Sequence, residues 1–356
     1  MIRVLIVEDS PIIVEFLQSI LTSDPGIEVV GAVRTGEAAL EAVKRYRPDV
    51  ITMDIHMPGM NGFEATRQIM ETVPTPIIIV SGNVTPEESA VTFQALEAGA
   101  LMVLPRPSGI GHSDHELTAQ KLVQSVKLMS EVKVVRRWPR SGRKKVTEIR
   151  SIELERKPEE PIRLVAIGAS TGGPQALQII LQGLPSNFSA PVVIVQHMAT
   201  GFIQSFAEWL GQSCALPVQI AVHEKLLQPG RVYIAPDGYQ VEMEPGDRLG
   251  LRACSAETHH CPSVSVFFRS VAKVNGRQVV GILLSGMGAD GAAELKLLRE
   301  RGAITIVQDE KSSVVFGMPG KAVSLGAAQY VLNPGQIAQY LKELNSGNPN
   351  PCFSEG

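Results

Sequence analysis

The chain has 356 residues and a formal net charge of −3 at pH 7. This length is enough for about two domains. The charge balance gives no sign of a nucleic-acid-binding or membrane-binding surface. The first residues enter a strand at once without a signal-peptide pattern, and no apolar run is as long as a membrane span. We therefore expect a cytoplasmic protein with no nucleic-acid partner and no membrane insertion.

The cysteines are scattered along the chain and form no C-x-x-C pair; they are Cys214, Cys254, Cys261 and Cys352. This pattern is typical of reduced thiols in a cytoplasmic protein. The run His259-His260-Cys261 contains metal-ligand residue types, but no second ligand pair accompanies it. A loop of ordinary composition explains this run better than a metal site does.

In residues 1–133, apolar runs alternate with segments of helical pattern. The expected strands are 4–7, 29–33, 50–53, 77–80 and 101–104, and the expected helices lie near 12–23, 36–46, 62–71, 86–98 and 115–132. Five such strand–helix units predict an α/β fold with a five-stranded, doubly wound parallel sheet of flavodoxin-like type. Ligands of such sheets bind beyond the carboxyl ends of the strands.

Charged and polar residues follow four of these strands. Glu8 and Asp9 follow the first, Asp54 the third, Ser81 the fourth and Arg106 the fifth. Three carboxylates at one sheet edge would raise one another's pKa, and Mg²⁺ would offset this repulsion. A carboxylate beside Mg²⁺ can attack a phosphoryl donor, while a hydroxyl and a cation bind the phosphoryl oxygens. Helix capping by acids, the alternative, does not account for all five positions.

These residues lie in stretches that resemble the receiver domain of two-component response regulators. The matching stretches are Val7-Glu8-Asp9-Ser10, Asp54-Ile55-His56-Met57-Pro58-Gly59-Met60-Asn61-Gly62 and Ala95-Leu96-Glu97-Ala98-Gly99-Ala100. The resemblance implies phosphorylation of Asp54, metal binding by Glu8, Asp9 and Asp54, and phosphate sensing by Ser81 and Arg106.

Two positions depart from the receiver pattern. Arg106 stands where the family usually has lysine, and a planar guanidinium is not equivalent to a compact ammonium. Val103 stands where many receivers carry an aromatic switch residue. We therefore expect phosphorylation itself to be kept and its relay to differ.

Residues 134–160 combine low apolar content with basic residues between 136 and 145 and glutamates between 153 and 160. This composition is typical of an inter-domain linker, and a solvated tether is favoured over a basic docking strip. A second, doubly wound α/β domain is expected over 161–346, with a tail at 347–356. Its expected strands are 164–167, 192–195, 279–284 and 304–307, and turns between 218 and 252 suggest hairpins.

The stretch Gly168-Ala169-Ser170-Thr171-Gly172-Gly173 links the first of these strands to a helix that begins near Pro174. Small residues allow a sharp turn, and the helix N-terminus offers free N–H groups and the positive end of its dipole. The stretch fits the G-x-S-x-G pattern of nucleophile turns. On its own, such a Gly/Ser-rich turn is more often a phosphate-binding loop or plain packing than a catalytic turn.

Two further loops supply the groups that a serine nucleophile needs. His197 follows the second expected strand and Asp290 follows the third. A serine hydroxyl needs an adjacent base, and the base needs an acid that orients it. Ser170, His197 and Asp290 fit these three roles in that order. The backbone N–H groups of Thr171 and Met287 are the expected oxyanion donors.

The order Ser…His…Asp differs from that of ordinary α/β-hydrolases, in which the acid precedes the histidine. Each residue also has a bland interpretation when taken singly. His197 fits a structural histidine at a strand end, and Asp290 fits a cap of the helix expected at 292–301. The three loops together favour catalysis.

Residues 161–346 resemble the catalytic domain of chemotaxis response regulator protein-glutamate methylesterases, the CheB family. The resemblance gives Ser170, His197 and Asp290 the roles of nucleophile, base and acid. Gly320 stands where a basic residue is common and Ser265 where aspartate is common, and we expect neither to touch the triad. The matching stretches are Gly168-Ala169-Ser170-Thr171-Gly172-Gly173-Pro174, Val195-Gln196-His197-Met198, Val232-Tyr233-Ile234-Ala235-Pro236, Pro262-Ser263-Val264, Leu284-Ser285-Gly286-Met287-Gly288-Ala289-Asp290-Gly291 and Val314-Val315-Phe316-Gly317-Met318-Pro319.

The resemblance implies hydrolysis of glutamate γ-methyl esters, and deamidation of glutamines, on methyl-accepting chemotaxis receptors, without a metal. It also implies that a chemotaxis histidine kinase phosphorylates the receiver, with Mg²⁺ as the receiver's cofactor, and that this uncovers the active-site face. One alternative is a response regulator whose second domain binds or acts on a non-chemotaxis partner; an intact triad disfavours it. Another is a transcription regulator, which would need a basic helix-turn-helix pattern.

Overall fold

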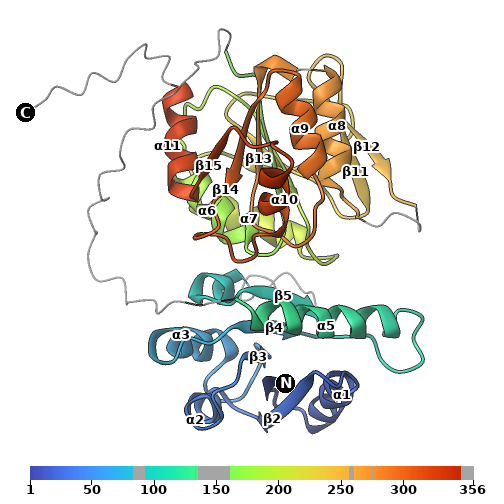
Figure 1. Cartoon of the computed structure of the whole chain (residues 1–356), viewed down its shortest axis with the longest axis vertical. Coiled ribbons are helices and arrows are strands. Elements are labelled where there is room, and N and C mark those ends of the chain that lie inside the picture. Colours follow the sequence, from blue (N-terminus) through green and yellow to red (C-terminus); the bar gives the residue numbers. More distant parts are fainter. Residues whose placement is uncertain (83–92, 133, 135–160, 256–259, 275, 346–356) are drawn as a thin grey trace, which may run out of the picture. The chain divides into compact units, whose positions relative to one another are not determined.

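The computed structural model describes residues 1–82, 93–132, 134, 161–255, 260–274 and 276–345 (Figure 1). The chain divides into two compact units, Met1–Lys144 and Lys145–Gly356. Most of the expected linker and all of the expected tail lie outside the described residues. Within the described part of the chain, no helix is long and apolar enough to cross a membrane.

The first unit is a five-stranded parallel sheet with the strand order β2-β1-β3-β4-β5. The expected helix at 86–98 falls partly outside the described residues, although 93–98 are helical. The strands are β1 (Ile2–Val7), β2 (Ile27–Val33), β3 (Val50–Met53), β4 (Ile77–Ser81) and β5 (Met102–Pro105), and the helices are α1 (Pro11–Thr22), α2 (Gly36–Tyr46), α3 (Gly62–Thr72) and α5 (His115–Ser130).

Local sequence signals fix where two of these helices begin. The side chain of Thr35 accepts a hydrogen bond from the N–H of Ala38 at the start of α2, and that of Asn61 accepts one from Glu64 at the start of α3. Each cap satisfies a helix N–H that would otherwise lack a partner. These caps set the lengths of the loops that follow β2 and β3.

The second unit is built on a seven-stranded parallel sheet with the order β15-β14-β13-β6-β7-β10-β8. Its central strands are buried on both faces, as their continuous runs of apolar residues predict. The strands are β6 (Leu164–Ala169), β7 (Val192–Gln196), β8 (Val218–Ile220), β10 (Val232–Ile234), β13 (Val279–Leu283), β14 (Ile304–Gln308) and β15 (Tyr330–Leu332).

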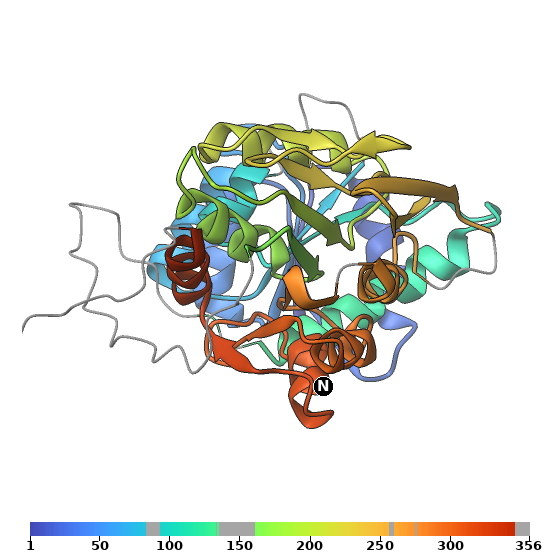
Figure 2. The same cartoon turned by 90° about the horizontal axis from the view of Figure 1, so that it is seen from above.

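Helices cover both faces of this sheet. Helix α6 packs against α7 and α11, whereas α9 packs against α8 and α10. Figures 1 and 2 show α6 and α11 on one face and α8 and α9 on the other. The helices are α6 (Gly173–Gln182), α7 (Ile203–Ser213), α8 (Val264–Val274), α9 (Ala292–Glu300), α10 (Gly317–Ser324) and α11 (Pro334–Asn345).

The expectation that the whole of 218–252 forms hairpins is wrong in part. Strand β10 joins the parallel sheet next to β7, and β8 pairs with β10 at the edge of that sheet. Strand β9 (Lys225–Leu226) pairs with β12 (Arg248–Ala253), which forms a hairpin with β11 (Tyr239–Glu244), so this small antiparallel sheet carries the expected hairpin. Helix α8 packs on β11, and this contact holds the N-terminus of α8 near the main sheet.

Candidate functional site

The three expected triad residues follow three neighbouring strands of the seven-stranded sheet. Ser170 comes directly after β6, His197 directly after β7, and Asp290 lies in the loop between β13 and α9. Strand β6 is the central one of the three. Since the strands are parallel, their carboxyl ends meet at one sheet edge, where ligands of open α/β sheets bind.

The turn after β6 is tight and held by backbone bonds. The N–H of Ser170 donates to the carbonyl of Ser285 at 3.0 Å, and the N–H of Gly173 donates to the carbonyl of Ser170 at 2.8 Å. Gly172 has φ +79°, a conformation that favours glycine. A Cβ on Gly172 would also lie 2.8 Å from the hydroxyl of Ser285. The turn therefore presents Ser170 beside the loop that follows β13.

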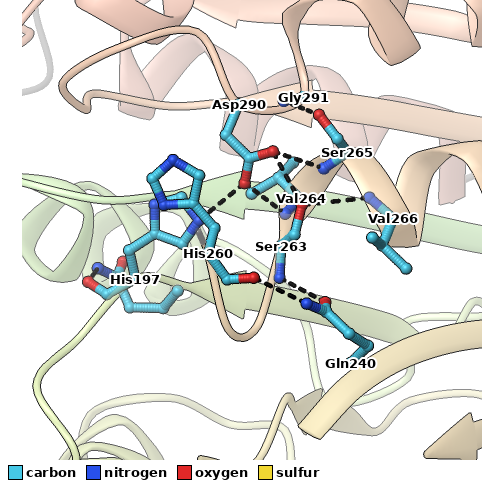
Figure 3. Close-up of polar contacts among 10 residues, drawn as sticks. His197, Gln240, His260, Ser263, Val264, Ser265, Val266, Asp290 and Gly291 are labelled. Carbon is cyan, nitrogen blue, oxygen red and sulfur yellow. Dashed lines mark hydrogen bonds and ion pairs between the residues drawn. The ribbon is translucent and has the colours of Figure 1, made fainter. Parts of the chain in front are cut away.

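His197 and Asp290 are in direct contact. Nε2 of His197 lies 2.9 Å from Oδ2 of Asp290, and their side chains are 17% and 5% exposed (Figure 3). Nδ1 is therefore the imidazole nitrogen left for the hydroxyl of Ser170. Within the described residues, no hydrogen bond joins that hydroxyl to His197. Such catalytic contacts often tighten only once substrate binds.

The carboxylate of Asp290 is held by the N-terminus of α8. Oδ1 accepts from the hydroxyl of Ser263 at 2.9 Å and from the N–H of Ser265 at 3.0 Å, and Oδ2 accepts from the N–H of Val264 at 2.7 Å (Figure 3). Burial alone would raise the pKa of Asp290, but hydrogen bonds from His197 and Ser265 bring this pKa far below its usual range. Asp290 is thus ionised at neutral pH.

This geometry corrects two interpretations made from the sequence. Asp290 does not cap α9, whose N-cap is Gly291. The expectation that Ser265 leaves the triad untouched is wrong, because its N–H donates to Asp290 and its hydroxyl accepts from the N–H of Gly291 at 2.8 Å. Within the part of the chain that the structure describes, the neighbour of Gly320 is Phe316 and not a residue of the proposed triad.

Sequence reasoning missed the role of Gln196, the last residue of β7. Its Nε2 donates to the carbonyl of Ser170 at 2.9 Å and to the carbonyl of His197 at 2.8 Å. The side chain is 2% exposed. One buried amide thus connects the loop of Ser170 to the loop of His197. A polar residue at the end of an otherwise apolar strand was the available signal.

The expectation that all four cysteines are reduced thiols is wrong, since Cys254 and Cys261 form a disulfide. Cys214 is free, and Cys352 lies outside the described residues. Because Cys261 is in the disulfide, it offers no thiolate to a metal. His259 also lies outside the described residues, while the ring of His260 stacks on that of His197.

The expected oxyanion donors are available. Within the described residues, no hydrogen bond uses the N–H of Thr171 or of Met287, whereas the N–H of Ser170 is already bonded to Ser285. The Met287 loop lies close to Ser170, because a Cβ on Gly286 would be 2.7 Å from Cβ of Ser170. Both free N–H groups therefore flank the serine.

In the first unit, the acids Glu8, Asp9 and Asp54 come together at the carboxyl ends of the neighbouring strands β1 and β3. One ligand oxygen from each lies within 4.8 Å of the other two. Burial, with the nearby charge of Asp54, raises the pKa of Glu8 to about 7, and burial also raises the pKa of Asp54. Such a set of hard oxygen donors suits a divalent cation, whose charge would relieve this crowding.

Arg106 and Ser81 lie at the same edge. A guanidinium nitrogen of Arg106 lies 3.2 Å from a carboxylate oxygen of Glu8, and the N–H of Arg106 donates to the carbonyl of Ser81 at 2.8 Å. Nε of Arg106 is buried and has no hydrogen-bond partner within the described residues. The cation expected to sense phosphate is therefore paired with one acid of the cluster.

Comparisons with known proteins find relatives of both units. The CheB methylesterase family model matches residues 165–341, and the response regulator receiver domain model matches residues 4–118. A protein-glutamate methylesterase/protein-glutamine glutaminase of Nitrosospira multiformis is 55% identical over 97% of this chain and 97% of its own, and one of Geobacter metallireducens is 54% identical over 97% and 99%.

Among solved structures, the CheB methylesterase catalytic domain of Thermotoga maritima is 34% identical, with a TM-score of 0.49, and covers 52% of this chain and 100% of its own. The two family models follow each other along the chain in the order receiver, then methylesterase. With relatives that match along nearly the whole length, the chain belongs to the CheB family of protein-glutamate methylesterases/protein-glutamine glutaminases.

Proposed function

We propose that this chain hydrolyses glutamate γ-methyl esters, and deamidates glutamines, on methyl-accepting chemotaxis receptors in the cytoplasm. Its receiver unit would be switched by a chemotaxis histidine kinase. The observation that carries the proposal is the pairing of His197 with an ionised Asp290, near the turn that holds Ser170. Both carboxylate oxygens of Asp290 also accept hydrogen bonds from the start of α8. Relatives named for that activity, 55% and 54% identical along 97% of this chain, support it.

In the proposed first step, Nδ1 of His197 takes the proton of the Ser170 hydroxyl as Oγ bonds to the ester carbonyl carbon. The carbonyl oxygen becomes an oxyanion that accepts from Thr171 and Met287. Asp290, ionised and bonded to Nε2, stabilises the imidazolium. The imidazolium then gives its proton to the leaving oxygen, which departs as methanol. With a glutamine substrate, ammonia departs instead.

In the second step, His197 takes a proton from water, whose oxygen attacks the acyl carbon. Collapse of the new oxyanion returns the proton to Oγ of Ser170 and releases glutamate. Removing a single oxyanion donor costs about 10²–10³ in turnover in a serine protease. Neither step calls for a metal.

For the receiver unit, we propose that Asp54 is the phosphorylated residue and that Glu8, Asp9 and Asp54 hold Mg²⁺. Bound Mg²⁺ would supply positive charge to the phosphoryl oxygens. Ser81 would donate to these oxygens and Arg106 would pair with them, which requires Arg106 to leave Glu8. When Arg106 exchanges Glu8 for the phosphoryl group, the local charge pattern changes. We propose that this change is the signal to which the catalytic unit responds.

The test is methanol release from methylated receptor membranes. The full chain is assayed with and without acetyl phosphate plus Mg²⁺, beside the variants Ser170→Ala and Asp54→Asn. We expect release to vanish in Ser170→Ala and to rise with the phosphodonor only when Asp54 is present. The exposed substitution Glu15→Gln on α1 is the matched control.

Two results would count against the proposal. Release that persists in Ser170→Ala would remove the triad assignment. No release from any receptor preparation would exclude these receptors as substrates and favour a non-chemotaxis partner.

A further inference from the structure

The proposed triad leaves unexplained a second histidine at its edge. The rings of His197 and His260 are stacked, with centroids 4.9 Å apart and planes inclined by 6° (Figure 3). We propose that His260 is a positioning residue that covers one face of the catalytic imidazole and sets how acid pH inhibits the enzyme. This inference rests on the proposed function of His197 as the base.

The backbone around His260 is held independently of His197. Nε2 of Gln240 donates to the carbonyl of His260 at 2.7 Å, and Oε1 of the same amide accepts from the N–H of Ser263 at 2.8 Å. Gln240 is 3% exposed. Cys261, the residue that follows His260 in the chain, forms a disulfide with Cys254. The ring of His260 therefore stands on an anchored backbone.

The same anchor reaches Asp290. Ser263, whose N–H is bonded to Gln240, donates its hydroxyl to Oδ1 of Asp290. The buried amide of Gln240 thus holds the backbone of His260, whose ring covers His197. It also holds Ser263, which donates to Asp290. The two catalytic residues are held from the same side by one short stretch of chain (Figure 3).

The stack has an electrostatic consequence, because the two rings differ in exposure. The side chain of His197 is 17% exposed, whereas His260 is exposed to solvent. When His197 takes the proton of Ser170 it becomes a cation, and the face of a neutral aromatic ring within about 6 Å attracts a cation. Neutral His260 therefore favours the imidazolium that the reaction requires.

Protonated His260 would act in the opposite direction. Two parallel imidazolium ions at this distance repel, so a charge on His260 disfavours proton transfer to His197. Within the described residues, Asp290 is a charged group that faces the pair, and it is bonded to His197 itself. Gln240 and the Cys254–Cys261 disulfide, which hold His260, carry no charge. A charge on one ring is therefore felt by the other ring.

The test uses a probe that does not depend on the receptor. A fluorophosphonate phosphonylates the serine, with formation of an Oγ–P bond, loss of fluoride and proton transfer to His197. Its rate is measured from about pH 5 to 9 for the full chain and for His260→Phe and His260→Ala. Phenylalanine keeps a flat ring without a titrating group, and alanine removes the ring. His223→Phe, another exposed histidine of the same unit, is the control.

We expect His260→Ala to lower the rate at about pH 8 roughly tenfold, because the cation loses its ring face. His260→Phe should stay within about threefold of the unchanged chain at that pH. At about pH 5.5, His260→Phe should react several-fold faster than the unchanged chain, because it has no second charge. On the acid side of the profile, the slope of log rate against pH should lie between one and two for the unchanged chain. It should be one for His260→Phe.

Histidine C2–H resonances give a second, substrate-free measurement. His197 should titrate in two phases in the unchanged chain and in one phase in His260→Phe. The inference is overturned if His260→Ala reacts like the unchanged chain, or if His260→Phe keeps the same acid limb and the same two-phase titration. Normal probe kinetics without methanol release from receptors would count against the proposed function alone.

Discussion

The guanidinium of Arg106 is paired with the carboxylate of Glu8 at 3.2 Å. The side chain of Arg106 therefore contacts one of the three acids, Glu8, Asp9 and Asp54, that form the acidic cluster of the receiver unit. Glu8 is 1% exposed, and the side chain of Arg106 is 26% exposed. A positive charge next to a cation site lowers the affinity of the site for Mg²⁺. Arg106 therefore both neutralises Glu8 and competes with the metal that the cluster would bind.

We predict that Arg106→Gln raises Mg²⁺ affinity several-fold at about pH 8, because the competing charge is gone. Titration calorimetry on the full chain measures this, with Arg67→Gln as the control, since Arg67 pairs with Glu64 on the surface of α3. The same variant should lose activation by acetyl phosphate, because its amide cannot pair with a phosphoryl group as a cation does. Weaker Mg²⁺ binding in Arg106→Gln would contradict the competition.

The raised pKa of Glu8 gives a pH dependence of stability with a definite sign. The carboxyl titrates near pH 4.5 when unfolded and at about 7 in the folded chain, so between these values the folded state binds more protons. Stability therefore falls as pH rises through this window. In metal-free buffer, Glu8→Gln should melt a few degrees above the unchanged receiver at about pH 8, and near it at about pH 5.

Differential scanning calorimetry of the full chain measures this difference, and the receiver transition is the one that Mg²⁺ shifts. Glu15→Gln, an exposed acid on α1, is the control and should show no such pH trend. A gain in melting temperature that is the same at both pH values would mean that Glu8 does not titrate as described.

Gln196 should matter for turnover more than for substrate binding. Gln196→Met keeps a long, unbranched side chain but removes both hydrogen bonds to the carbonyls of Ser170 and His197. Small displacements of reacting groups cost about 10² in rate, so we predict a 10- to 100-fold loss of kcat with KM changed by less than about threefold. Gln204→Met, on the exposed side of α7, is the control. An unchanged kcat would show that the two loops hold their positions without the amide.

The placement of the three proposed triad residues could be predicted from the sequence because each follows the end of a strand. Parallel strands with continuous apolar runs were visible, and each was followed by a loop with one reactive side chain. Once the strands were parallel and adjacent, Ser170, His197 and Asp290 had to share an edge. The same logic brought Glu8, Asp9 and Asp54 together.

What the sequence did not reveal depends on long-range packing. The donors to Asp290 come from the start of α8, a segment whose position is set by its contact with β11. The short strands β8 and β10 were interpreted as hairpins because turns flank them, yet β10 pairs in parallel with β7, and β8 pairs in parallel with β10. The His260 stack and the disulfide likewise arise only after the chain folds.

Val264 packs between strand β6, which precedes Ser170, and the loop that carries Asp290. Its side chain is fully buried, and its N–H donates to Oδ2 of Asp290. A Cβ on Gly168 would lie 2.9 Å from Cγ2 of Val264, and a Cβ on Gly291 would lie 3.0 Å from its Cβ. The glycine at 168 is therefore needed because of the bulk of Val264, and any push on Val264 is passed to the catalytic acid.

This packing predicts a coupled pair of substitutions. Gly168→Ala overpacks the site and should lower stability by about 1–3 kcal/mol, with a loss of kcat because the donor to Asp290 moves. Val264→Ala alone leaves a cavity and should also destabilise the chain. In the double variant the new methyl group fills part of that space, so its loss of stability should be smaller than the sum of the two single losses.

The free energy of unfolding, from chemical denaturation, and kcat are measured on the unchanged chain, the two single variants and the double variant. Together these values form a double-mutant cycle. Partial recovery of kcat in the double variant, relative to Gly168→Ala, is the expected sign that Val264 transmits the strain to Asp290. Additive losses in both measurements would mean that the two sites are independent, and that the small residue at 168 serves the backbone of β6 alone.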